Sequence, residues 1–122
     1  MSASREAAPD DAEDDLDLLV TYVPAQDTNR VLDALFAVGA GAIGAYRECA
    51  FVSPGIGQFR PVVGADPAIG RVGELEHVAE QRIELVLPRS RRAQVVAALR
   101  AAHPYEEPAF HVLPTARLRG SM

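Results

Sequence analysis

The sequence contains no lysine, and all twelve of its basic residues are arginines. This absence excludes any mechanism that needs a lysine Schiff base or the lysine of a phosphate-binding P-loop. Exclusive use of arginine suits anion recognition, but a compositional bias of the genome is the favoured explanation. The patterns G-x-S-x-G, H-E-x-x-H and C-x-x-C are also absent, and no spacing in the sequence suggests a catalytic pair.

Cysteine and long apolar runs are scarce as well. Cys49 is the one cysteine, so no disulfide can form within the chain, and a reducing compartment is the simpler expectation. No run of about 18 apolar residues occurs, and therefore no transmembrane helix is expected. The first residues are acidic and lack the basic and apolar regions of a signal peptide. We therefore predict a cytoplasmic protein with no membrane partner.

The net charge of −5 is concentrated at the N-terminus. Residues 1–15 hold six acids and one arginine, which leaves eleven acids and eleven arginines in the remainder. A nearly neutral body gives no reason to expect nucleic acid as a partner. We predict a disordered acidic tail over 1–15, a single domain over 16–114 and a C-terminal tail over 115–122.

The order of apolar patterns predicts the fold. Alternating or continuous apolar runs indicate strands, and apolar residues at a spacing of three and four indicate helices. Capping residues and glycines mark the helix ends. The expected elements are a strand over 18–23, a helix over 28–38, a strand over 46–52, a loop over 53–70, a strand over 72–87, a helix over 90–102 and a strand over 109–113. This β-α-β-β-α-β order predicts an α+β, ferredoxin-like sandwich, in which two helices cover one face of an antiparallel sheet.

Residues 39–44 match G-x-G-x-x-G, the pattern of dinucleotide-binding loops. That loop works because a strand precedes the glycines and a helix follows them, which brings the phosphates to a helix N-terminus. Here the order is reversed, so the glycines are expected to end a helix and form a tight turn. Further on, Arg89, Arg91 and Arg92 stand at the start of the second helix, where cations are unfavourable. They are expected to be solvated, or to serve an anion or a neighbouring subunit.

The segment 103–108, His-Pro-Tyr-Glu-Glu-Pro, offers the densest group of ligand-binding side chains. An imidazole with two carboxylates suits a divalent metal, so His103, Glu106 and Glu107 form a candidate metal site. The alternative is a structural connection in which His103 satisfies the last helix carbonyls and Tyr105 packs under the sheet. In that case the two glutamates would meet arginines across a subunit contact.

The predicted loop over 53–70 is rich in glycine and proline, and loops of this length are often functional. Backbone amides near Gly55 and Gly57 could form an anion nest, and Phe59 and Arg60 are its bulky side chains. With Tyr105, these four residues form a candidate site for a small ligand. The alternative is that the loop packs on a neighbouring subunit.

Three stretches together resemble the small inserted domain of the NGG-interacting-factor family, whose members are also described as dinuclear-metal, GTP-cyclohydrolase-like proteins. They are GAGAIGAY at 39–46, SPGIGQFRPVVGADPAIG at 53–70 followed by VGELEHVAEQR at 72–82, and HPYEEPAF at 103–110. The last stretch also resembles the H-P-Y-E-x-P segment of CutA divalent-cation-tolerance proteins. The resemblance implies a PII-like ferredoxin fold that commonly forms trimers.

The resemblance covers about residues 16–114, and the chain looks like the inserted domain on its own. In the family, flanking lobes are expected to supply the two-metal site, so a hydrolase activity does not carry over. We therefore expect a non-enzymatic, oligomeric PII/CutA-like module, with a trimer favoured, that binds a small ligand or divalent metal in clefts between subunits. The alternatives are a metal-dependent, hydrolase-like enzyme or subunit, and an interaction module for a larger family member.

Overall fold

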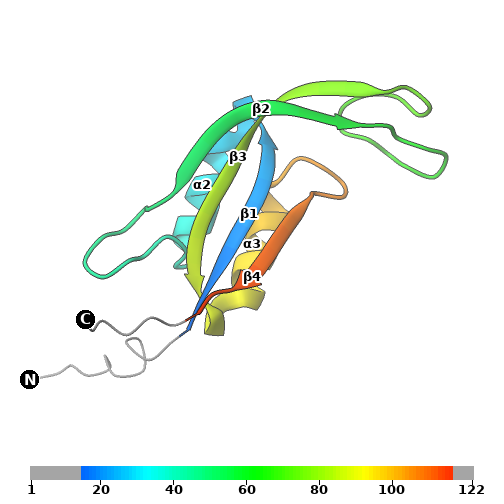
Figure 1. Ribbon diagram of the computed structural model, residues 1–122. Coiled ribbons are helices and arrows are strands. Elements are labelled where there is room, and N and C mark those ends of the chain that lie inside the picture. The colour runs from blue at the N-terminus through cyan, green and yellow to red at the C-terminus, as the bar shows by residue number, and fades with distance from the viewer. Residues whose placement is uncertain (1–14, 117–122) are drawn as a thin grey trace, which may run out of the picture.

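The computed structural model describes residues 15–116, which form four strands, two helices and two short 3-10 helices (Figure 1). The elements in chain order are β1 (Leu16–Pro24), η1 (Ala25–Asp27), α2 (Thr28–Ala37), β2 (Phe51–Phe59), β3 (Glu76–Pro88), η2 (Arg89–Arg91), α3 (Arg92–Ala102) and β4 (Phe110–Pro114). No helix in this part of the chain is long and apolar enough to cross a membrane.

The strands form one antiparallel sheet in the order β2-β3-β1-β4, and both helices lie behind it in Figure 1. This arrangement confirms the predicted ferredoxin-like α+β fold. The two central strands pair along nine residues, from Leu16 opposite Pro88 to Pro24 opposite Glu80. β2 and β4 are the edge strands.

The core lies between the sheet and the two helices. It is built from alternate residues of β1 and β3 and from the apolar stripes of the helices. The strands contribute Leu19, Val23, Ile83, Leu85 and Leu87, and the helices contribute Val31, Leu35, Val95 and Leu99. Burial of each such side chain contributes about 1.5–3 kcal/mol. Because side chains alternate along a strand, the residues between these core positions face the other side of the sheet.

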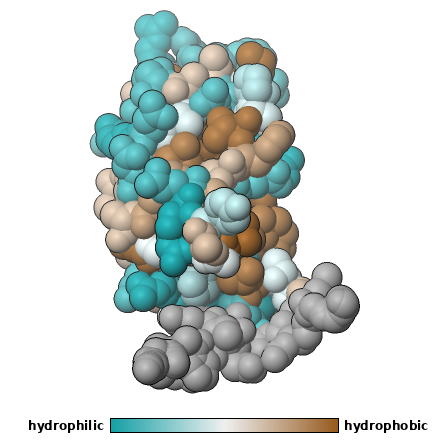
Figure 2. Space-filling model, turned by 90° about the vertical axis from the view of Figure 1, so that its left-hand side faces the viewer, coloured by the Kyte–Doolittle hydropathy of each residue, from teal (hydrophilic) through white to brown (hydrophobic). Residues whose placement is uncertain are grey.

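No described helix covers that other face. Leu18 stands opposite both Val86 and Leu113 across the central strands, so three apolar side chains meet there. Phe51 lies at the β2 edge and is 62% exposed, while Leu113 on β4 is 50% exposed. We refer to Leu18, Phe51, Val86 and Leu113 as the open-face cluster. Figure 2 looks at the molecule from the β2 side, edge-on to this face, and shows brown apolar patches between teal hydrophilic ones.

The second strand differs from the prediction. The expected strand at 46–52 and loop at 53–70 are wrong, because β2 runs over Phe51–Phe59 and pairs with β3 throughout. Glu48 takes a left-handed backbone with φ of 59°, and the Cys49 amide donates to the Gly41 carbonyl, so the segment before Phe51 belongs to a loop. Pro54 is tolerated because β2 is an edge strand with a single partner.

Residues 60–75 form the connection between β2 and β3, and β3 begins at Glu76 rather than at the predicted Val72. Upstream, the glycines at 39–44 follow α2 and not a strand. Gly39, Gly41 and Gly44 all have positive φ, as the turn interpretation requires. The amide of Gly41 donates to the carbonyl of Val86, which ties this turn to β3.

Asp17 changes the interpretation of the arginines at the start of α3. Its carboxylate is fully buried and accepts hydrogen bonds from Arg89 Nε and Arg92 Nε, each at 2.7 Å. Burial alone would raise the pKa of Asp17, but the two arginine hydrogen bonds outweigh it and lower that pKa below its ordinary value. Arg89 and Arg92 are therefore structural partners of β1, and their expected role as solvated charges is wrong.

The two ends of the described chain lie side by side. The amide and hydroxyl of Thr115 both donate to the carbonyl of Leu16, at 3.1 and 2.7 Å. The predicted tail over 1–15 lies outside the described residues except for Asp15, whose carboxylate accepts from Arg89. Of the predicted tail over 115–122, residues 117–122 also lie outside them.

Candidate functional site

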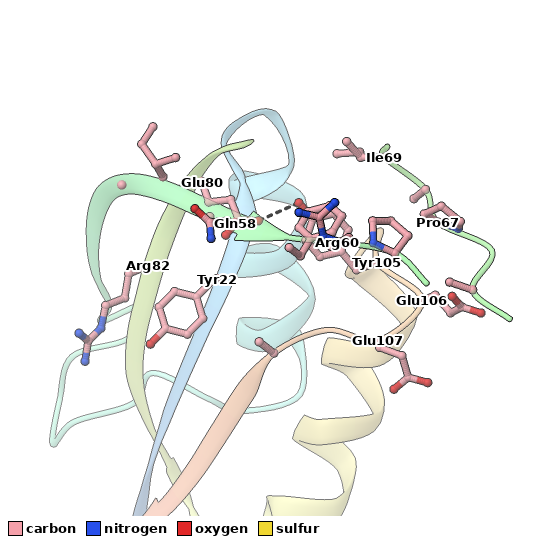
Figure 3. A pocket seen from close by; sticks show the side chains of 18 of the residues that line it. Tyr22, Gln58, Arg60, Pro67, Ile69, Glu80, Arg82, Tyr105, Glu106 and Glu107 are labelled. Atoms are coloured by element: carbon pink, nitrogen blue, oxygen red, sulfur yellow. Dashed lines mark hydrogen bonds between the residues drawn. The ribbon is translucent and has the colours of Figure 1, made fainter. Parts of the chain in front are cut away.

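A pocket of about 750 Å³ opens at the end of the sheet where β2 continues into the 60–75 connection (Figure 3). Three segments enclose it: β2 from Ser53 onward, the connection as far as Ile69, and the turn between α3 and β4. Its walls are mainly apolar. A volume of this size falls in the range of small-molecule sites in proteins.

Most of the residues predicted as a site line this pocket. They come from β2, the start of the connection and the α3–β4 turn, and they are Gly55, Gly57, Phe59, Arg60, Tyr105, Glu106 and Glu107. They are separated by up to 52 positions in the sequence, and the fold brings them together because β2 runs past the α3–β4 turn. His103, the eighth predicted residue, lies behind Tyr105 and outside the lining.

Tyr105 organises one wall of the pocket. Its ring meets the Phe59 ring edge-on at 5.5 Å between centroids and lies 5.0 Å from the His103 ring. Its hydroxyl donates to Glu80 Oε2 at 2.7 Å. Burial and this bond to a carboxylate raise the pKa of Tyr105, so the phenol stays protonated and acts as a donor.

Glu80 reaches Tyr105 by crossing β2. The space that a Cβ at Gly57 would fill is occupied by the Glu80 carboxylate. Gly57 therefore has a steric role in an extended strand, and neither it nor Gly55 has the positive φ of a turn. The predicted anion nest at these two glycines is wrong, because a nest needs amides in a turn conformation, whereas both glycines lie in an extended strand.

Two hydrogen bonds order the 60–75 connection, one within it and one to the α3–β4 turn. Arg60 Nη1 donates to the carbonyl of Gly73 at 2.8 Å, and the Asp66 amide donates to Glu106 Oε1 at 3.0 Å. The second bond joins the connection directly to the α3–β4 turn. One wall of the pocket thus depends on contacts between segments forty residues apart.

His103 is buried, with both ring nitrogens engaged. Nδ1 accepts from the Tyr105 amide at 3.1 Å, which leaves Nε2 to carry the proton and donate to the Tyr22 carbonyl at 2.7 Å. Burial lowers the pKa of His103 below its ordinary value of 6.5, despite the opposing effect of the Tyr22 carbonyl. The neutral imidazole therefore joins β1 to the α3–β4 turn.

The structure does not assemble the predicted metal site of His103, Glu106 and Glu107. Both nitrogens of His103 are used in hydrogen bonds, so neither offers a lone pair to a metal. Glu106 already accepts from Asp66. No group of three or more His, Cys, Asp or Glu residues within 15–116 is arranged to hold a metal ion. His103 instead has a structural role. Its side chain bonds to the Tyr22 carbonyl on β1, whereas the sequence predicted a bond to the last carbonyls of the helix.

Sequence reasoning missed several lining residues. Tyr22, Glu80 and Arg82 face the pocket from the central strands, and Pro67 and Ile69 from the connection. Strand alternation indicates that Tyr22 and Arg82 avoid the core, yet only the register shows that they stand opposite each other. Cys49, His77 and His111 lie outside the pocket lining. Cys49 had been expected in a strand, but it lies in the loop before β2.

The four-stranded sheet and its two helices define a ferredoxin-like fold of the type seen in CutA proteins. The periplasmic divalent cation tolerance protein CutA from Archaeoglobus fulgidus superposes with a TM-score of 0.62 at 17% identity, and the alignment covers 85% of this chain and 87% of that one. At this identity the likeness concerns the fold alone. No family model matches the sequence.

The chain is similar in sequence to part of longer proteins. It is 54% identical over 98 residues to the GTP cyclohydrolase 1 type 2 homolog of Mycobacterium tuberculosis, which covers 80% of this chain and 26% of that protein. The structure of a Bacillus cereus protein related to NIF3 superposes with a TM-score of 0.73 at 39% identity, covering 85% of this chain and 26% of that one. The chain thus spans about a quarter of the length of the curated relatives that it matches.

Proposed function

We propose that the protein is a self-associating PII/CutA-like module that binds a small ligand in the pocket beside Tyr105 and catalyses no reaction. The observation that supports it is the convergence of β2, the 60–75 connection and the α3–β4 turn on one pocket with mainly apolar walls. Aromatic side chains with a few fixed polar groups are typical of ligand sites. The lone cysteine excludes a disulfide within the chain and favours a reducing, cytoplasmic location for this module.

Self-association is supported by the open-face cluster. A sheet that packs helices on one face normally exposes polar residues on the other, whereas this one exposes Phe51 on β2 and Leu113 opposite Leu18. A second copy would cover these side chains and the free edges of β2 and β4. A trimer is the assembly that the resemblance to CutA proteins implies.

Two measurements on the full chain test the proposal. Light scattering during size-exclusion chromatography at micromolar concentration should give a mass above that of a monomer. Nuclear magnetic resonance screening of the ¹⁵N-labelled protein against a library of small fragments should shift amides of pocket residues such as Phe59 and Tyr105. A monomer with no fragment bound near those residues would refute both halves of the proposal.

A second candidate is a module that works within, or docks onto, a larger relative of the GTP cyclohydrolase 1 type 2 homologs. The contact between Leu16 and Thr115, near the two ends of the described residues, favours it, since a domain joined to other lobes on both sides needs these two points close together. Pull-down with the immobilised chain and the purified Mycobacterium tuberculosis relative would test it. Absence of a stable complex would leave only the first candidate.

A further inference from the structure

The charges around the pocket do not balance. Five lining residues are charged at neutral pH, and they are Arg60, Arg82, Glu80, Glu106 and Glu107. Arg82 is neutralised outside the lining by Glu84, with Nη2 and Oε2 2.9 Å apart. That pair leaves Arg60 alone against three carboxylates, so the pocket attracts cations more than anions.

Glu80 is the carboxylate at the centre of this imbalance. It is half-buried on β3, and its Oε2 accepts from the neutral hydroxyl of Tyr105. Among the described residues, no arginine or histidine forms an ion pair with it. Its side chain is fixed by Tyr105 and by its passage over Gly57, so a ligand would meet a preoriented carboxylate.

The surroundings of Glu80 suit an apolar body. The Tyr105 hydroxyl binds Glu80, and the Phe59 ring packs edge-on against the Tyr105 ring. Pro67 and Ile69 line the same pocket from the connection (Figure 3). Aromatic faces also attract cations, which adds to the effect of the carboxylate. Exposed ion pairs contribute little free energy because water and salt screen them. Glu80 is half-buried, so an ion pair with it is screened less.

We propose that the ligand of this pocket is a small organic cation, in which an ammonium or guanidinium group pairs with Glu80 and an apolar body packs on Phe59 and Ile69. This inference rests on the proposed function, because it names the class of ligand for the same pocket. Carboxylated and phosphorylated molecules of the same shape are disfavoured by the three carboxylates.

Three fragments with one shared body test the inference. 4-Phenylbutylamine, 4-phenylbutanol and 4-phenylbutyrate would each be titrated into the ¹⁵N-labelled full chain at pH 7, with amide shifts as the readout. The amine should bind about fivefold more tightly than the alcohol, as one partly screened ion pair implies, and the butyrate should bind most weakly. All amide shifts should centre on Phe59, Glu80 and Tyr105.

Glu80→Gln should remove the preference for the amine, so that the amine and the alcohol bind with equal affinity. The matched control is Asp33→Asn, which removes one charge from the exposed side of α2 and should change nothing. Equal or tighter binding of the butyrate would overturn the inference while the pocket remained a ligand site. Failure of all three fragments to shift pocket amides would overturn the inference together with the proposed ligand.

Discussion

The carboxylate of Glu80 occupies the position that a side chain at Gly57 would take, on the neighbouring strand of the sheet. The same carboxylate accepts the Tyr105 hydroxyl. Gly57, Glu80 and Tyr105 therefore form one structural unit. The missing side chain of Gly57 leaves the space in which Glu80 reaches Tyr105.

Replacing this glycine should disturb both stability and the pocket. In Gly57→Ala the new Cβ would force Glu80 aside and break its bond to Tyr105, at a cost of about 1–3 kcal/mol of unfolding free energy. Urea denaturation measures the loss. Gly55→Ala is the matched control, because a Cβ there meets open space in the same strand. It should be neutral, or stabilise by about 0.5–1 kcal/mol. Equal behaviour of the two variants would contradict the steric role of Gly57.

Stability should depend on His103 in mildly acidic solution. Its folded pKa is lowered, so the unfolded chain binds the proton more tightly. The stabilisation is fully present above the ordinary pKa of about 6.5 and is lost as the pH falls from there toward the folded pKa. Urea unfolding at intervals between pH 8 and pH 5 should show the decline.

His103→Ala should abolish this pH dependence and cost about 1–3 kcal/mol at pH 8, because the Tyr22 carbonyl and Tyr105 amide lose their partner. His111→Ala, on the exposed side of β4, serves as the control and should retain the wild-type profile. An unchanged slope in the His103 variant would show that another group titrates.

The buried carboxylate of Asp17 should matter more than any surface acid. Asp17→Asn should cost about 1–3 kcal/mol, a moderate value because Arg89 and Arg92 are only partly buried and regain water. Asp33→Asn should lie within about 0.5 kcal/mol of wild type. Since the pKa of Asp17 is lowered, its contribution is present above about pH 3.8 and lost as the pH falls through its folded pKa. Thermal unfolding of both variants at pH 7 and pH 3 would test this, and equal losses at both pH values would contradict it.

The open-face cluster should control assembly. Phe51→Glu and Leu113→Glu each place a charge on the uncovered side of the sheet and should lower the mass seen by light scattering toward that of a monomer. Val63→Glu tests a side chain that is 92% exposed in the 60–75 connection and should leave the mass unchanged. If the connection forms the subunit contact instead, the Val63 variant alone will dissociate.

The fold was predictable because local signals agreed with it. Apolar spacing located both helices, and the central strands were long enough to stand out from their surroundings. The edge strand β2 was missed because Pro54, Gly55 and Gly57 are turn residues by composition, and only the sheet edge and the space required by Glu80 explain them.

The candidate site was predictable only in part. The chemistry of 103–108 drew attention to Tyr105, which does line the pocket. Glu80 gave no signal, since its position beside Tyr105 depends on strand register and on contacts 25 residues apart. The pairing of Asp17 with Arg92 spans 75 positions, so the helix pattern alone misjudged those arginines. Long-range partners, rather than local propensity, separate the prediction from the structure.

The hydrogen bond between Thr115 and Leu16 has a consequence for the insertion of such a domain into other proteins. Leu16 and Thr115 stand at the ends of neighbouring strands, which lie about 5 Å apart. A host loop of hairpin width could accept the segment between these two residues without stretching either junction. The same closeness makes the described domain suitable for circular permutation, in which a short linker joins Leu16 to Thr115 and new ends open in the loop before β2.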